Sequence, residues 1–227
     1  MERSRLLAEI KTWLTGIACP HPLRVGIDGI DTAGKTTLAD ELAQEISATT
    51  THYPLRASVD GFHQPRATRY QQGPDSPEGY YADSFDYGAL IARLLQPLGP
   101  GGERRVETAV FDLQKDTPLY TTPQVVAANT ILLCDGVFLQ RPALRPYWDI
   151  IIYLDIRFET ALERAVMRDT AILGSAAAVR ARYLQRYIPG QQIYLASCHP
   201  QQFAHMVIDH NDLSNPTIVS WRAPQKC

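Results

Sequence analysis

Residues 26–40 read GIDGIDTAGKTTLAD, and this stretch decides the fold that the rest of the sequence supports. Gly29, Gly34, Lys35 and Thr36 satisfy the pattern G-x-x-x-x-G-K-[ST], which binds the phosphates of a nucleotide when it joins a strand to a helix. The same pattern also occurs by chance in glycine-rich turns. Its neighbours in the chain therefore decide between the two interpretations.

Both neighbours of this stretch have the required character. The preceding run LRVGIDG (23–29) is typical of a short strand. In the segment that follows, Leu38, Leu42 and Ile46 recur at the i, i+4, i+8 spacing of a helix. The G-x-G-x-x-G pattern of dinucleotide sites is absent here, which argues against a nicotinamide cofactor. The context favours a phosphate-binding loop.

A loop of this kind is expected to hold ATP or GTP together with Mg²⁺. Its glycines let successive backbone N–H groups point at one phosphate, and the following helix adds the positive end of its dipole. Lys35 is expected to reach the β- and γ-phosphates, and the Thr36 hydroxyl to bind Mg²⁺. Asp28 and Asp31 are expected to be loop-capping or surface groups. The predicted nucleotide-binding residues are Gly29, Ile30, Asp31, Thr32, Ala33, Gly34, Lys35, Thr36 and Thr37.

A second carboxylate near the metal is predicted at Asp135. It follows four apolar residues in ILLCDG (131–136), so it lies at the carboxyl end of a buried strand. That end of the strand faces the crevice where ligands of α/β sheets bind. The alternative is a turn aspartate before Gly136. The upstream loop favours a role near Mg²⁺, directly or through water.

The remaining apolar runs predict the fold class. Further buried strands are expected at 130–136, 149–156 and 205–210, with helices at 157–170 and 176–187 between them. Strands that alternate with helices predict an α/β fold with a doubly wound, mainly parallel sheet of five strands flanked by helices. The whole chain, 1–227, is expected to form one domain.

The composition changes between Asp60 and about residue 128. This segment is rich in proline, glycine and tyrosine and is too long for a simple connection, so it is predicted to be an insertion that builds an acceptor-binding site. The run PLRASVDG (54–61) reads as a second strand that delivers Asp60 to the same edge of the sheet. A carboxylate there could take the proton of an alcohol as a phosphoryl group is transferred to it. The alternative is that Asp60 caps the turn at Gly61.

Six motifs together resemble one group of enzymes. They are GIDGIDTAGKTTLA, VDGFHQPR, GYYADSFDY, CDGVFL, YWDIIIYLD and RAVMRD, which occur in this order between about residues 23 and 210. The set is similar to the uridine kinase and phosphoribulokinase group of P-loop kinases, to which bacterial pantothenate kinases are also related. It is most like bacterial proteins called uridine kinases or uridine kinase-like.

The resemblance implies a P-loop NTPase fold and transfer of the γ-phosphate of ATP or GTP to a hydroxyl. Asp60 stands where the family places its catalytic aspartate, and Lys35 and Thr36 occupy the nucleotide-phosphate and Mg²⁺ positions. The acceptor pocket departs from the uridine kinase pattern. His63 stands where those enzymes have a tyrosine, and VFDLQKD (110–116) replaces their YDF…H segment. The candidate acceptor-binding residues are His63, Tyr80, Tyr81, Asp86, Phe111 and Asp116.

Late arginines predict a helical lid over about residues 157–190. Arg157, Arg164 and Arg168 fall in one narrow stripe of a helix. Guanidinium groups there could neutralise charge on the transferred phosphoryl group, so Arg164 and Arg168 are predicted to be catalytic. These two also match an R…RD motif in the lids of related kinases. The alternative is that the arginines form solvated helix faces.

Bulk composition limits the partners and the compartment. A net charge of −2 gives no reason to expect a nucleic-acid or anionic-membrane surface. The four cysteines are scattered, which argues against a zinc site or a disulfide framework. Residues 1–17 carry several charged side chains, so they are not a secretory signal. Their apolar residues recur at helical spacing, which indicates an amphipathic helix: Leu6, Leu7, Ile10, Trp13, Leu14 and Ile17. A cytoplasmic protein is expected, with a homo-oligomer among the states left open.

The favoured function is an ATP-dependent kinase that phosphorylates a hydroxyl of a small metabolite, with the 5′-hydroxyl of uridine or cytidine first. Pantothenate or another small alcohol is the alternative acceptor. A different class, a nucleotide-dependent switch or regulatory ATP-binding protein, would hydrolyse slowly and transfer nothing. The insertion argues against a switch, because a switch needs no acceptor pocket beside the γ-phosphate.

Overall fold

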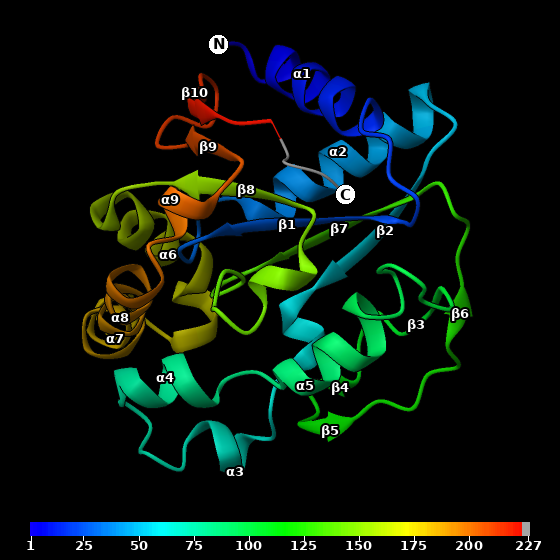
Figure 1. The fold of residues 1–227 in the computed structure, drawn as a ribbon. Helices are drawn as coiled ribbons and strands as arrows, with labels where there is room; N and C mark the ends of the chain where they lie inside the picture. Colours follow the sequence, from blue (N-terminus) through cyan, green and yellow to red (C-terminus); the bar gives the residue numbers. More distant parts are fainter. Residues whose placement is uncertain (224–227) are drawn as a thin grey trace.

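The chain folds around one six-stranded sheet with helices on both faces (Figure 1). The structure is a computed structural model that describes residues 1–223. The strands lie in the order β10-β9-β8-β1-β7-β2. All neighbouring pairs run parallel except β10 and β9. Their bounds are β1 Leu23–Gly29, β2 Tyr53–Ser58, β7 Thr130–Gly136, β8 Ile150–Asp155, β9 Met206–Asp209 and β10 Thr217–Trp221.

The expected α/β fold is confirmed, but the number of strands was wrong. The sixth strand, β10, pairs antiparallel with β9 at one edge of the sheet. Its residues are alternately exposed and half-buried, because an edge strand faces solvent on one side. The strands were predicted from continuous apolar runs, and TIVSW (217–221) is not such a run because Thr217 and Ser220 are polar.

The central strands are buried along their whole length. Every residue of β1 and β7 is buried, which is why both read as almost continuous apolar runs. One face of the sheet is covered by α1 (Arg3–Thr15) and α2 (Lys35–Thr49), as Figure 1 shows. Six of the helix positions predicted from spacing are buried in this layer of the core: Leu6, Ile10, Leu14, Leu38, Leu42 and Ile46. The other three, Leu7, Trp13 and Ile17, are partly buried against it.

The other face carries the insertion and the later helices. Its core includes Phe138, Trp148 and Tyr194, packed with apolar residues of the insertion. The insertion contains η1 Val59–Phe62, α3 Arg66–Arg69, α4 Pro77–Asp83, α5 Tyr87–Leu90, η2 Ile91–Leu95, β3 Arg105–Val106, β4 Phe111–Asp112, β5 Thr117–Pro118 and β6 Gln124–Val125. The four short strands form two antiparallel pairs, β3 with β6 and β4 with β5.

The predicted lid region is helical but turns back on itself. Helix α6 (Phe158–Leu173) ends at Gly174, whose φ of 85° is the left-handed value that glycine adopts without strain. The chain then continues through α7 Ala176–Arg182, η4 Tyr183–Tyr187 and α8 Ile188–Cys198. The remaining short helices are η3 Arg145–Tyr147 and α9 Pro200–Phe203.

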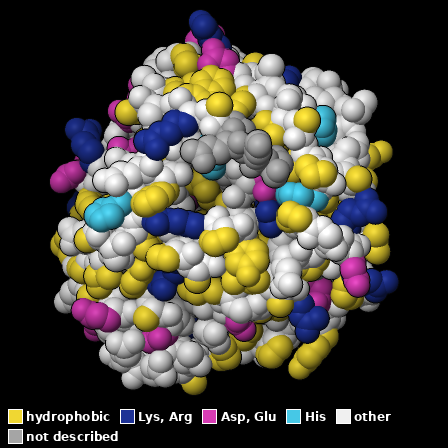
Figure 2. Space-filling view, viewed as in Figure 1, with side chains coloured by type: hydrophobic (Ala, Val, Ile, Leu, Met, Phe, Trp, Pro, Cys, Tyr) yellow, Lys and Arg dark blue, Asp and Glu magenta, His cyan; other side chains and the backbone are white. Residues whose placement is uncertain are grey.

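The face viewed in Figure 2 carries charges of both signs, and three cysteines lie within the described residues. Figure 2 shows Lys and Arg side chains interspersed with Asp and Glu on the viewed face. Within residues 1–223, no helix has the length and apolar content that crossing a bilayer demands. Cys19, Cys134 and Cys198 are free thiols. Cys227 lies outside the described residues.

Candidate active site

The glycine-rich loop leaves the carboxyl end of β1 at the centre of the sheet and enters α2. Gly29 and Gly34 have φ values of 155° and 89°, which non-glycine residues rarely adopt. A Cβ atom on Gly29 would lie 2.6 Å from the carbonyl oxygen of Leu154, and one on Gly34 would lie 2.9 Å from the His210 ring. Neighbouring strands and loops therefore press directly on the loop, and glycine is required at both positions.

Lys35 begins α2 and lies inside the loop. Its ammonium group donates a hydrogen bond of 2.7 Å to the carbonyl oxygen of Ile30. Burial lowers the pKa of Lys35, while the carboxylates of Asp31, Asp28 and Asp135 oppose that shift. Lys35 is thus a buried cation that would gain from a phosphate placed on the loop.

Thr36 and Asp135 meet as the sequence predicted they would. The Thr36 hydroxyl donates a 2.7 Å hydrogen bond to Asp135 Oδ2, across 99 positions of sequence. A hydroxyl and a carboxylate are oxygen donors of the kind that Mg²⁺ prefers. The donor set therefore fits Mg²⁺, with Thr36 and Asp135 as the residues that would hold it.

The sequence interpretation missed Arg56, which lies on the other side of Asp135. Its Nη2 donates to Asp135 Oδ1 at 2.8 Å, and its Nε donates to Asp40 at 2.8 Å. The side chain of Asp135 is only 3% exposed, so this guanidinium compensates a nearly buried charge. The sequence did contain a signal for Arg56. Side chains alternate between the two faces of a strand, so Arg56 and Ser58 fall on the same face of β2.

A cavity of about 770 Å³ connects the loop with the insertion and the lid. Asp60, Lys35, Thr36 and Asp135 all line it. Its wall also includes His63, Tyr80, Phe85, Leu113, Val137, Arg164, Arg168, Tyr183 and Tyr187. The phosphate loop, the metal pair and the predicted base therefore share one space.

Asp60 reaches this cavity from the short turn η1 that follows β2. Its side chain is 70% exposed and makes no hydrogen bond within residues 1–223. The turn is capped by Ser58, whose hydroxyl accepts from the backbone N–H of Asp60. Ser58 therefore fills the alternative role of turn cap, and the Asp60 carboxylate lines the cavity without a hydrogen bond, with its Oδ1 4.0 Å from His63 Nδ1.

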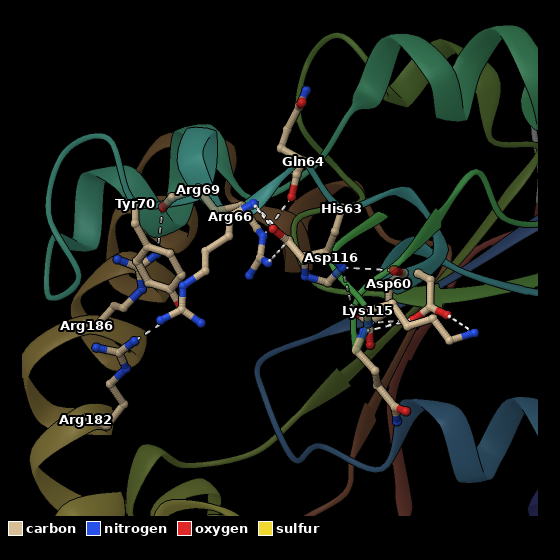
Figure 3. Close-up of polar contacts among 12 residues, drawn as sticks. Asp60, His63, Gln64, Arg66, Arg69, Tyr70, Lys115, Asp116, Arg182 and Arg186 are labelled. Atoms are coloured by element: carbon tan, nitrogen blue, oxygen red, sulfur yellow. Dashed lines mark hydrogen bonds and ion pairs between the residues drawn. The ribbon is translucent and has the colours of Figure 1, made fainter. Parts of the chain in front are cut away.

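His63 lies beside Asp60, as Figure 3 shows. Its Nδ1 is 2.9 Å from the backbone oxygen of Asp60, which can only accept, so Nδ1 carries the proton and Nε2 is a hydrogen-bond acceptor. Burial lowers the pKa of His63, which favours this neutral form. The ring packs on Phe85 with centroids 4.5 Å apart.

Of the six candidate acceptor residues, His63 and Tyr80 line the cavity and the other four do not. Tyr81 turns into the core, and its hydroxyl lies 3.1 Å from Ser197 Oγ. Asp86 caps α5 by accepting from the backbone N–H of Ala89. Their predicted roles as acceptor ligands find no support in these positions.

Phe111 and Asp116 also lie away from the cavity lining. Phe111 is buried in the pair β4–β5. Asp116 accepts from the backbone N–H of Arg66 and pairs with the Arg69 guanidinium at 2.9 Å (Figure 3). Both residues hold the insertion together, and a role in acceptor binding stays a prediction.

The lid arginines line the cavity, yet each is already engaged. Arg164 donates to the backbone oxygens of Thr32, His210 and Asn211 at 3.3, 2.9 and 2.8 Å. Arg168 pairs with Asp169 at 2.6 Å and donates to the Tyr183 hydroxyl at 3.1 Å. Arg164 therefore fastens α6 to the phosphate loop, while contact of either arginine with a phosphate stays a prediction.

The expected surface role of Asp28 and Asp31 was wrong for Asp28. Its side chain is fully buried on β1 and accepts from the Tyr194 hydroxyl and the Gln140 amide. Burial raises the pKa of Asp28. Tyr194 and Gln140 lie more than 100 positions away in the sequence, so no local pattern could have identified this network.

Asp31 is half-buried and faces the cavity. Its carboxylate accepts from the Tyr80 hydroxyl at 3.0 Å and from Gln191 at 2.9 Å, and burial raises its pKa. Asp31 thus links the phosphate loop to α4 of the insertion, whose Tyr80 lines the cavity, and to α8.

Two arginines join the lid to the insertion (Figure 3). Arg186 is 2% exposed and donates to backbone oxygens of residues 69, 73, 74 and 76. Arg182 pairs with Asp75 at 2.9 Å and donates to the Tyr70 hydroxyl. Segments more than 100 positions apart are therefore held as one wall.

One other cluster within residues 1–223 has side chains of the kind that bind metals, but its carboxylate already pairs with the Arg24 guanidinium. Cys19, His21 and Asp149 place one ligand atom each within 4.8 Å of one another. Asp149 accepts three hydrogen bonds from Arg24, one from its backbone and two from its guanidinium. The cluster therefore anchors the start of β1 to the start of β8.

Comparison with known proteins gives a family match over most of the chain. The model of the phosphoribulokinase / uridine kinase family matches residues 25–213. Uridine-cytidine kinase B of Dictyostelium discoideum is 27% identical over 154 residues, which are 68% of this chain and 61% of that kinase. The chain thus spans less than two thirds of this relative. Uridine kinase of Lactobacillus helveticus is 31% identical over 153 residues, which are 63% of this chain and 67% of that enzyme.

Solved structures show the same fold. A possible uridine kinase from Bacillus stearothermophilus has a TM-score of 0.72 at 25% identity, covering 91% of this chain and 99% of that chain. D-glycerate 3-kinase from Cryptococcus neoformans has a TM-score of 0.59 at 11% identity, covering 95% of this chain and 97% of that chain. The second likeness concerns the fold alone.

Proposed function

The chain belongs to the phosphoribulokinase / uridine kinase family, and from this premise we propose that it transfers the γ-phosphate of ATP to a hydroxyl of a nucleoside, with the 5′-hydroxyl of uridine or cytidine first. The observation that carries the proposal is the uncommitted carboxylate of Asp60 in the same cavity as Lys35 and the pair Thr36–Asp135. A phosphate-binding loop beside a free base suits transfer to an alcohol.

The mechanism follows from where these groups lie. Lys35 and the loop amides would hold the triphosphate, while Thr36 and Asp135 would hold Mg²⁺, which would supply positive charge beside the phosphate groups when bound. Asp60 accepts the proton of the acceptor hydroxyl as the new P–O bond forms. The bond between the γ-phosphorus and the β,γ-bridging oxygen breaks, and ADP leaves with that oxygen on its β-phosphate. The cavity walls orient the two substrates for in-line transfer.

The acceptor side of the cavity supports an aromatic or heterocyclic acceptor. Tyr80, Phe85 and Tyr187 present rings on which a base could stack. The neutral His63 offers Nε2 as a hydrogen-bond acceptor, so it suits a donor such as a ring N–H or a sugar hydroxyl. Pantothenate or another small alcohol is the second candidate, since His63 departs from the uridine kinase pattern.

The experiment is an acceptor panel. The purified chain is mixed with ATP, Mg²⁺ and, one at a time, uridine, cytidine, pantothenate and several sugars, and ADP release is measured. We expect uridine or cytidine to accelerate release most, with a phosphorylated product of matching mass. Acceleration by pantothenate alone would move the acceptor to the second candidate. Release that no acceptor accelerates would favour a nucleotide-dependent switch and overturn the proposal.

A further inference from the structure

A second cavity, of about 590 Å³, lies beside the phosphate loop. It meets the first cavity at Thr32, Gly34, Thr37 and Leu213, which line both. Its outer wall is formed by Glu2, Arg3 and Ser4, with His210 and Ser214 completing the lining. Residues 2–4 precede the range 25–213 that the family model matches.

This cavity lies on the side of the phosphate loop where the nucleoside end of a bound nucleotide would extend. Asp60, Lys35 and Asp135 line the first cavity but not the second. The second cavity instead touches Gly34 and Thr37, at the start of α2. A nucleoside triphosphate is a linear molecule, so when its terminal phosphate faces Asp60 its nucleoside must leave the loop on another side. The second cavity is the hollow available there.

Arg3 is held in this wall by contacts with α2 and with the loop that follows β9. Its Nε and Nη2 bind Glu41 of α2 at 2.9 and 2.6 Å. Its Nη1 lies 2.9 Å from His210 Nε2 and donates to the carbonyl oxygen of Leu213 at 3.3 Å. The guanidinium plane is therefore fixed before any ligand binds, which keeps the entropy cost of using it low.

His210 continues this chain of contacts to the phosphate loop. Its Nδ1 is 2.6 Å from the backbone oxygen of Ala33, so Nδ1 carries the proton and Nε2 accepts from Arg3. The residue is fully buried, and burial together with the charges of Arg3 and Arg164 lowers its pKa, in keeping with a neutral ring. The start of α1 thus has a fixed position relative to the loop.

We propose that the start of α1 forms the base compartment of the nucleotide site, with a purine ring packed against the Arg3 guanidinium. The Glu2 carboxylate and the Ser4 and Ser214 hydroxyls are the groups that select between adenine and guanine. A guanidinium plane stacks well on an aromatic face. A carboxylate accepts from N–H groups, of which the two purines present different sets. This inference rests on the proposed nucleotide-dependent function.

The test separates the base from the phosphates. Dissociation constants are measured by calorimetry, with Mg²⁺, for ATP, GTP and inorganic tripolyphosphate, which has no base. In Arg3→Ala we expect ATP and GTP to bind about tenfold more weakly, the scale of losing one stacking contact, while tripolyphosphate changes less than about twofold. Arg5→Ala is the matched control, because Arg5 pairs only with Glu9 on the surface of the same helix. It should bind all three ligands like the wild type.

A second variant keeps the proposal testable if Arg3→Ala does not fold. Glu2→Gln removes only a charge from an exposed side chain, and we expect it to change the ratio of ATP to GTP affinity by about threefold or more. Equal weakening of nucleotides and tripolyphosphate in Arg3→Ala would overturn the proposal, since Arg3 would then act only through the loop. An unchanged affinity ratio in Glu2→Gln would overturn the assignment of Glu2. Tight nucleotide binding with no acceptor phosphorylated would refute the proposed function and leave this inference standing.

Discussion

Replacement of Asp60 by asparagine should separate proton removal from nucleotide binding. The substitution keeps the shape of the side chain and removes its ability to accept a proton. The structure permits a clean comparison, because Ser58 and the backbone bond to His63 hold the turn without help from the Asp60 carboxylate. The side chain is 70% exposed, so we expect the free energy of unfolding to change by less than about 0.5 kcal/mol.

The expected loss of turnover is large because no neighbouring group readily replaces the Asp60 carboxylate as a base. Loss of a general base lowers kcat by roughly 10²- to 10⁴-fold, or about 3–5 kcal/mol in the activation free energy. His63 Nε2 is the other acceptor in this part of the cavity, and its depressed pKa makes it a weaker base. We therefore expect a loss of at least about 10²-fold. Nucleotide affinity should be unchanged or slightly higher, because one negative charge near Lys35 and the phosphates is removed.

The assay is steady-state ADP release with the best acceptor, together with the dissociation constant for ATP. Glu103→Gln is the matched control, because Glu103 is an exposed acid of the same insertion that does not line the cavity and makes no ion pair within residues 1–223. Its turnover should equal that of the wild type. Turnover of Asp60→Asn within about threefold of the wild type would refute the reasoning, since no step would then depend on this carboxylate.

Three further results are expected. Lys35→Ala should raise the dissociation constants for ATP and for tripolyphosphate alike, by about tenfold or more, because it removes the buried cation from the loop. Turnover should fall as well. Calorimetry measures both dissociation constants, and a weaker affinity for ATP alone would contradict this expectation. Arg56→Met should lower the free energy of unfolding by about 1.5–3 kcal/mol, since it leaves the nearly buried Asp135 charge without its guanidinium. In a urea-denaturation double-mutant cycle the loss should shrink when Asp135 is already asparagine, and equal losses in both backgrounds would count against the pairing. His210, whose folded-state pKa lies below its ordinary value of 6.5, should make the protein less stable as pH falls below about 6.5, because the unfolded chain then binds the proton more readily. His210→Gln should flatten that dependence in denaturation curves, and an unchanged slope would exclude this histidine as its source.

The sequence by itself determined the phosphate loop and the layers around it. Gly29, Gly34, Lys35 and Thr36 are nearly contiguous, so their geometry follows from local backbone requirements that any reader of the chain can recognise. The buried strands could also be predicted, because burial on both faces leaves continuous apolar runs. The helices α1 and α2 could be predicted from the helical spacing of their buried residues. Asp135 could be placed beside Thr36 because parallel strands end at the same edge of a sheet.

The tertiary structure alone decided which side chains enter the cavities. Tyr80 and Tyr81 are adjacent and chemically alike, yet successive residues on a helix point about 100° apart. Tyr80 therefore lines the cavity, whereas Tyr81 is partly buried and points toward Ser197. Arg56 and Arg3 reach their partners across 79 and 207 positions of sequence. Such contacts depend on how whole elements pack against each other, and no local pattern of residues specifies that packing.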